Sequence, residues 1–192
     1  MRTSSFVILA MTVHLWACGG VSAGGSGAAA GDLKALSFSA FGLTVTRPAD
    51  WTFVAPDATS SKDAVVLVVE TPADRRFGAS VEIGRRPLSA ADRQQPAAEV
   101  LALLKTELVE TAQGFGGSAA VQETMVAGLP AVRSQFKMTE TFLEGGEMER
   151  AGRLVALVYR GDVWMIRALG PADGSGDASI DRIVASIALE PN

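Results

Sequence analysis

Val132-Arg-Ser-Gln-Phe-Lys-Met-Thr-Glu-Thr-Phe142 is the stretch that decides the fold class. Its apolar residues, Val132, Phe136, Met138 and Phe142, alternate with the polar residues Arg133, Gln135, Lys137, Thr139 and Thr141. A period of two predicts a strand with one face buried and one face in water, which is typical of an antiparallel sheet.

Similar runs on both sides of this stretch predict a meander of strands. They lie at residues 121–126, 153–159 and 163–169, and turns are predicted at residues 127–130, 144–147 and 161–162. Gly161-Asp162 between two apolar runs is a hairpin signal. Further strands are predicted in the first half at residues 64–69 and 80–84. Residues 36–39 and 43–46 fit either two short strands or one strand with a bulge at Gly42. Trp51, just after a proline turn, is expected in the core.

Two amphipathic helices accompany the strands. One begins after Pro96 and places Ala97, Val100, Leu101, Leu104 and Leu108 on one face. The other is predicted near the end, with Asp177 as its cap and Ile180, Ile183, Val184 and Ile187 as its apolar stripe. The sum is an α+β fold, a mainly meander antiparallel sheet of about seven strands with helical cover.

The N-terminus has the pattern of a secretory leader. Arg2 precedes an apolar run over residues 6–15, which is too short to span a bilayer. Leu15-Trp-Ala-Cys18 closes the run and resembles the bacterial lipoprotein lipobox. That resemblance implies a signal peptide over residues 1–17 and a lipid on the thiol of Cys18, which would anchor the protein to a membrane.

A flexible tether is predicted after the cysteine. Residues 18–31 are almost all Gly, Ala and Ser, and such a coil spans roughly 20 Å. Residues 32–192 are then expected to form a single globular domain. Gly19 stands where aspartate would retain a lipoprotein in the inner membrane, so the expected location is the bacterial cell envelope, on the outer membrane facing the periplasm if there are two membranes.

Composition argues against most familiar enzyme classes. The only histidine, His14, lies in the leader, and Cys18 is the only cysteine. The mature chain would therefore lack Ser-His-Asp and Cys-His catalysis and zinc sites of the usual ligands. Loss of Arg2 leaves 16 basic against 21 acidic residues, a formal charge of −5, so no nucleic acid partner is expected. No enzyme activity, cofactor or metal is predicted.

Four short motifs carry a resemblance to a known family. They are Pro48-Ala-Asp-Trp51, Gly128-Leu-Pro-Ala131, Gly161-Asp-Val-Trp164 and Asp181-Arg-Ile-Val-Ala-Ser-Ile187. With the order of elements, they resemble the PsbP-like family, which includes LpqN-type lipoproteins and DcrB, over residues 36–189. The resemblance implies an α/β/α sandwich and a non-catalytic accessory or binding role. Its motifs are turn and core residues, so it implies a fold more directly than a function.

Three functions remain open from the residues. The first is a lipid-anchored envelope protein that binds a protein partner. The second is a carrier of a small apolar ligand or lipid, whose candidate contacts also fit plain core packing: Phe136, Met138, Phe142, Met148 and Met165. The third is a carboxylate enzyme or cation site formed by Glu140, Glu144, Glu147 and Glu149, which equally fit a solvated turn. Strict alternation places Glu140 on the apolar face.

Overall fold

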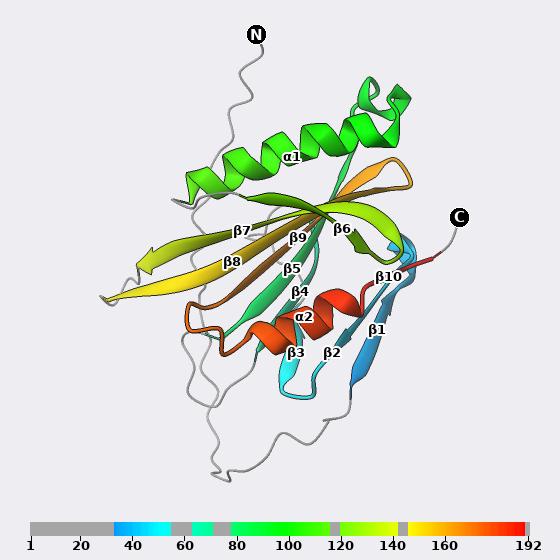
Figure 1. The fold of residues 1–192 in the computed structure, drawn as a ribbon. Coiled ribbons are helices and arrows are strands. Elements are labelled where there is room, and N and C mark those ends of the chain that lie inside the picture. The colour runs from blue at the N-terminus through cyan, green and yellow to red at the C-terminus, as the bar shows by residue number, and fades with distance from the viewer. Residues whose placement is uncertain (1–32, 55–62, 71–77, 116–119, 142–145, 191–192) are drawn as a thin grey trace.

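The computed structural model describes residues 33–54, 63–70, 78–115, 120–141 and 146–190 (Figure 1). The predicted leader, Cys18 and the tether lie outside these residues, as do Phe142 and Glu144.

The main sheet has seven strands, and every neighbouring pair is antiparallel. Its strands are β3 (Trp51–Val54), β4 (Ala64–Glu70), β5 (Ser80–Pro87), β6 (Val121–Val126), β7 (Leu129–Thr141), β8 (Glu147–Tyr159) and β9 (Asp162–Pro171). The order β3-β4-β5-β9-β8-β7-β6 joins two meanders along β5 and β9. The predicted antiparallel α+β class is confirmed, and the second meander corresponds to the strands expected on both sides of residues 132–142.

Tight turns close the β6–β7 and β8–β9 hairpins. Ala127 and Gly128 have φ angles of 52° and 75°, and Arg160 and Gly161 have 51° and 75°. Two consecutive positive φ angles define the turn type whose twist matches that of the flanking strands. The turn predicted at Gly161-Asp162 therefore lies one residue earlier, and Asp162 begins β9.

Helix α1 (Ala97–Gly114) covers one face of the sheet over β7 and β8 (Figure 1). Of the predicted apolar stripe, Val100, Leu104 and Leu108 are buried together with Ala112, whereas Leu101 is half-buried and Ala97 is exposed. Leu104, Leu108 and Ala112 meet Val132, Phe136, Leu154 and Ala156 in one cluster, which we call the α1 cluster. The Phe115 ring, which follows the helix, stacks on Phe136 with 4.7 Å between the ring centroids.

The opposite face is covered by helix α2 (Asp177–Ala185) together with a second, three-stranded sheet (Figure 1). This sheet has the order β1-β2-β10, with β1 (Lys34–Phe38), β2 (Leu43–Arg47) and β10 (Ala188–Leu189). The short helices η1 (Ser39–Phe41) and η2 (Asp92–Gln94) lie in connections. The predicted segments 36–39 and 43–46 correspond to two separate strands rather than one bulged strand, and their pairing into a separate cover layer was not predicted. The cover on this face is therefore only partly helical.

A second core lies between this mixed layer and the main sheet. Trp51, Ile83 and Ile166 of the main sheet are buried against Val45 of β2 and Ile183 of α2. The predicted core position of Trp51 is confirmed, because its side chain is fully buried. Two hydrogen bonds join the layer internally: Thr46 N donates to Ser186 Oγ at 2.9 Å, and Ser186 Oγ donates to Thr46 O at 3.0 Å.

Within the described residues, neither helix combines the length and the apolar composition that crossing a bilayer requires.

Candidate binding site

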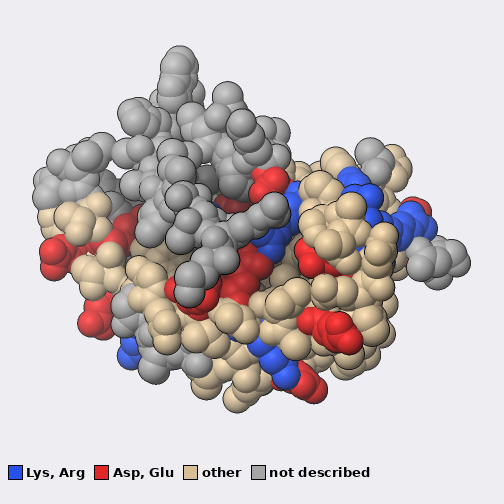
Figure 2. Space-filling view, turned by 90° about the horizontal axis from the view of Figure 1, so that it is seen from above, with Lys and Arg blue, Asp and Glu red and all other residues tan. Residues whose placement is uncertain are grey.

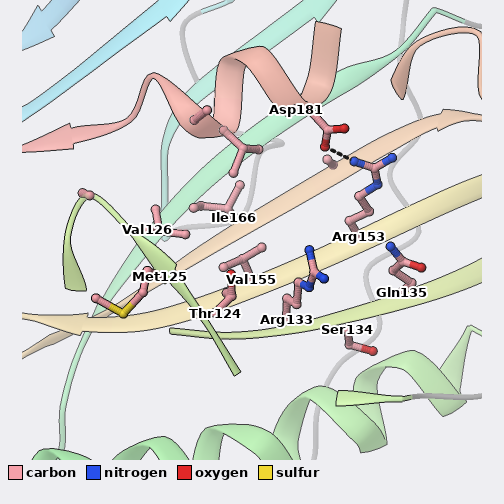
Figure 3. A pocket seen from close by; sticks show the side chains of 14 residues that line it. Thr124, Met125, Val126, Arg133, Ser134, Gln135, Arg153, Val155, Ile166 and Asp181 are labelled. Carbon is pink, nitrogen blue, oxygen red and sulfur yellow. Dashed lines mark hydrogen bonds and ion pairs between the residues drawn. The ribbon is translucent and has the colours of Figure 1, made fainter. Parts of the chain in front are cut away.

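A groove of about 370 Å³ lies between α2 and the strands β6, β7, β8 and β9 (Figure 3). Its apolar surface comes from Val126, Val155, Ile166, Ala168 and Val184. Its polar rim comes from Arg133, Gln135, Arg153 and Asp181. We call this feature the α2 groove.

The strand register explains why polar side chains reach the groove. Arg133 pairs with Val155, and Gln135 pairs with Arg153, so these residues share the face of the sheet that α2 covers further along. The buried residues of α2, Ile180 and Ile183, pack toward the other half of the sheet. Because α2 packs on β5 and β9 and stops short of β7, the β7 side of this face remains open.

Arg153 on β8 is held by two carboxylates of α2. Its Nη2 atom lies 2.8 Å from Asp177 Oδ2, and its Nη1 atom bonds to Asp181, as the dashed line in Figure 3 shows for the latter pair. The prediction that Asp177 caps α2 through its side chain is wrong. Gly176 holds the cap position without a side-chain hydrogen bond, and Asp177 is already helical, so its carboxylate reaches Arg153 instead.

Two further cations on β7 lack carboxylate partners in the described part of the chain. Arg133 donates from Nε and Nη2 to Gln122 Oε1, at 3.2 and 2.8 Å, and this acceptor is a neutral amide. Lys137 is exposed and forms no ion pair with any described residue. By contrast, Lys105 pairs with Glu123. Among the described residues, Arg133 and Lys137 therefore have no carboxylate within ion-pair distance.

A second hollow of about 540 Å³ continues the groove along β7 and β8. It shares Arg133, Gln135 and Arg153 with the first hollow and adds Lys137 and Ala151. Its far wall includes Ala120 and Gln122, at the point where β6 begins. The two hollows form one continuous depression along the β7 side of the sheet.

Ser134 lies between Arg133 and Gln135 in the sequence, but its side chain lies on the other face of the sheet. Its hydroxyl is buried and has no hydrogen-bond partner. Figure 3 shows its side chain on the opposite side of β7 from Arg133 and Gln135, toward α1. The Ser134 hydroxyl therefore does not point into the α2 groove.

The apolar residues considered for ligand binding lie on the α1 face. Phe136, Met138 and Met165 all pack in or against the α1 cluster, and Phe136 stacks on Phe115. Met148 is half-buried on β8 opposite Glu140, and Phe142 lies outside the described residues. Phe136 alone also borders the second hollow. Their role in ligand binding stays a prediction.

The glutamates considered for a cation site do not converge in the described residues. Glu140 Oε2 lies 3.6 Å from Nη1 of the buried Arg150, whose Nη2 donates to Gly78 O at 2.9 Å. Burial lowers the pKa of the Arg150 guanidinium, and the charge of Glu140 partly opposes this. Glu147 and Glu149 are exposed, and no cluster of three or more potential metal ligands occurs in the described ranges.

Charged side chains are paired across much of the described surface. Arg85 Nε lies 2.7 Å from Asp162 Oδ2, Arg86 pairs with Glu107, and Arg167 Nη2 lies 2.6 Å from Glu82 Oε2. On the face seen in Figure 2, basic and acidic side chains are accordingly interspersed. Arg133, which lines both hollows, and Lys137, which lines the second, differ from these arginines because neither forms an ion pair with a described carboxylate.

The α2 groove was not predicted from the sequence, although one of its polar surfaces was. The polar positions 133, 135 and 137 were recognised as one wet strand face. Nothing in the sequence places Arg153 and Asp181 next to that face, because both positions depend on the packing of α2. The groove thus depends on tertiary packing, and only its polar strand face on β7 could be recognised from the sequence.

The sequence matches no model of a known protein family, and no curated protein matches it. Several solved structures match the fold. LpqN of Mycobacterium tuberculosis, described as involved in cell envelope biogenesis, has a TM-score of 0.55 at 19% identity, over 83% of this chain and 91% of LpqN. The cyanobacterial PsbP of Synechocystis sp. PCC 6803 has a TM-score of 0.51 at 15% identity, over 88% of this chain and 98% of its own.

A eukaryotic protein has a similar architecture. The Ran-binding protein Mog1p of Saccharomyces cerevisiae has a TM-score of 0.50 at 9% identity, over 82% of this chain and 95% of its own. At these identities the likeness concerns the fold alone. The structure therefore has the PsbP-like fold, as the four sequence motifs implied.

Proposed function

We propose that this protein is a non-catalytic accessory protein of the bacterial cell envelope, anchored through a lipid on Cys18, which binds a protein partner through the α2 groove. The observation that carries the proposal is the groove itself. It combines apolar floor residues such as Val155 and Ile166 with Arg133, a cation that has no carboxylate partner among the described residues. An apolar centre with a polar rim is the usual anatomy of a protein interface.

Two proteins of similar fold support an envelope location and a protein partner. LpqN is described as involved in cell envelope biogenesis, and Mog1p as a Ran-binding protein. One fold thus occurs in a protein of the envelope and in a protein that binds another protein. A similar fold does not imply a similar binding site, so the proposal depends on the groove rather than on these neighbours.

The N-terminal sequence supports the anchor and its location. The apolar leader ends in Leu15-Trp-Ala-Cys18, and the tether that follows would let the domain turn near the bilayer. Gly19 after the cysteine favours the outer membrane facing the periplasm in a cell with two membranes. The absence of histidine and cysteine after position 18 supports a role in binding rather than in catalysis.

Mass spectrometry of the full-length protein, extracted from its own membrane in mild detergent, tests both parts. Under denaturing conditions, we expect a chain that begins at Cys18 and carries acyl groups. Under native conditions, we expect an added mass of protein size. A chain without lipid would contradict the anchor. An added mass of lipid or metabolite size would contradict the protein partner and favour the carrier.

A further inference from the structure

Strand β7 is much longer than the strand beside it. Its pairing with β6 ends where Val121 meets Ser134, whereas its pairing with β8 continues to Thr141 and Glu147. Residues 135–141 therefore have no strand on their outer side within the described chain. In Figure 1 this end of β7 and β8 extends beyond the neighbouring strands.

We propose that this free edge, residues 135–141 of β7, binds an extended acidic segment of the partner, which adds a strand beside β7 in line with β6. This inference rests on the proposed function and names the kind of segment that the partner supplies. The outer edge of a strand presents backbone N–H and C=O groups, and strand addition satisfies them with main-chain hydrogen bonds.

The α2 side of the edge selects for acidic residues. Gln135, Lys137 and Thr139 are all exposed there, and Lys137 has no carboxylate partner among the described residues. Side chains directly opposite each other on adjacent strands lie about 5 Å apart, which suits an ion pair. An Asp or Glu opposite Lys137 would also lie in the second hollow, which Lys137 lines with Arg133.

The α1 side of the edge selects for apolar residues. Phe136 is buried and Met138 is half-buried, and both belong to the α1 cluster. Glu140, next on this side, is already paired with Arg150. Methionine adapts to varied apolar neighbours, so the residue opposite Met138 is expected to be apolar. Since side chains alternate along a strand, the expected segment alternates acidic and apolar residues.

Charge also decides against a second copy of this chain as the occupant. Two β7 edges paired antiparallel about Lys137 would set Lys137 of one copy opposite Lys137 of the other. Like charges on paired strands are destabilising. An acidic segment from a different protein places a carboxylate opposite Lys137 instead.

The test is selection of displayed random octapeptides on the full-length chain in detergent, followed by fluorescence anisotropy with a selected peptide. We expect enriched peptides to alternate apolar and acidic residues. Lys137→Glu should weaken their binding about fivefold or more, since it exchanges an attraction for a repulsion. Replacing the acidic residues of the peptide with lysine should restore binding to the Lys137→Glu chain.

Lys34→Glu is the matched control, because Lys34 is an exposed lysine on β1, outside the main sheet. It should leave the affinity unchanged. Hydrogen exchange on the unmodified chain gives a second readout that needs no variant: the peptide should slow exchange at backbone amides within residues 135–141.

Three results would overturn the inference: no enrichment of alternating acidic peptides, protection located elsewhere, or a dimer of this chain that forms through the β7 edge. None of them would overturn the proposed function, because a partner that binds the rest of the α2 groove would still crosslink there in cells. Absence of any groove crosslink would remove the proposed function itself.

Discussion

Phe136 of β7 and Gly152 of β8 are cross-strand partners, and the Phe136 ring occupies the space that a side chain at position 152 would need. The ring is in turn stacked on Phe115 and almost completely buried. Phe136 is also a buried residue of the free β7 edge itself. The absence of a side chain at position 152 thus allows this aromatic ring to join the sheet to the end of α1.

Gly152→Ala should lower the free energy of unfolding by about 1–3 kcal/mol, because the ring and the strand must shift to accommodate one methyl group. Urea denaturation measures this difference. Gly114→Ala is the matched control, since a Cβ there meets nothing within 4 Å. It should leave stability unchanged or slightly raised. Equal effects of the two substitutions would show that the Phe136 ring does not need the space above position 152.

Glu140→Gln should destabilise the domain by about 1 kcal/mol, because it removes the charge facing the buried Arg150. The loss is smaller than for a fully buried pair, since Glu140 is about one-third exposed and 3.6 Å away. Glu147→Gln, at an exposed position on the same hairpin, should change stability by less than about 0.5 kcal/mol. Thermal unfolding with both variants checks this. A neutral Glu140→Gln would mean that the Glu140 charge does not stabilise Arg150.

The stabilising contribution of the Lys105–Glu123 ion pair should depend on pH. A hydrogen bond from the Lys105 ammonium, and then its charge, lower the pKa of Glu123 below the ordinary value of 4.5. A lowered carboxyl pKa means that the pair contributes fully above about pH 4.5 and that its contribution is lost as the pH falls through the lowered value. Carbon-13 NMR titration should give a midpoint below 4.5 for Glu123.

Lys105→Met should return that midpoint to the ordinary range, whereas Lys137→Met, on another strand, should not move it. An unchanged midpoint in Lys105→Met would contradict the assigned cause.

The elements with a clear periodicity were predictable from sequence. Leu104 and Leu108 marked the buried stripe of α1, and the alternation around Phe136 marked β7 with the correct face inward. Glu140 was correctly placed on the apolar face, although its partner Arg150 was not foreseen. Local patterns report which side of an element is buried, but not what covers it.

Features that depend on long-range packing were not predictable in the same way. The strand β10 has only two residues, which is too short to show a hydrophobic period. The sequence therefore could not predict all strands of the second sheet. Asp177 is a residue type that often caps helices. Its carboxylate instead pairs with Arg153, which lies 24 positions earlier in the chain. The α2 groove exists because α2 stops short of β7, which no residue pattern encodes.

Cys18→Ser should abolish lipid attachment, because the proposed lipid is carried by the only thiol in the chain. Metabolic labelling with an alkyne-bearing fatty acid should tag the unmodified protein and not this variant. Gly19→Ala, which changes the neighbouring residue and keeps the thiol, should remain labelled. Labelling that persists in Cys18→Ser would contradict the proposed anchor.

Site-specific photo-crosslinking in living cells tests the central claim most directly, with the reactive residue placed at Gln135 in the α2 groove of the full-length chain. Gln135 is exposed and lies between the uncompensated cations Arg133 and Lys137. We predict one discrete protein adduct from Gln135 that is absent when the reactive residue replaces Lys34 on β1, and that weakens in Arg133→Glu. No adduct from Gln135, or the same adduct from Lys34, would contradict the claim that this protein binds its partner through the α2 groove.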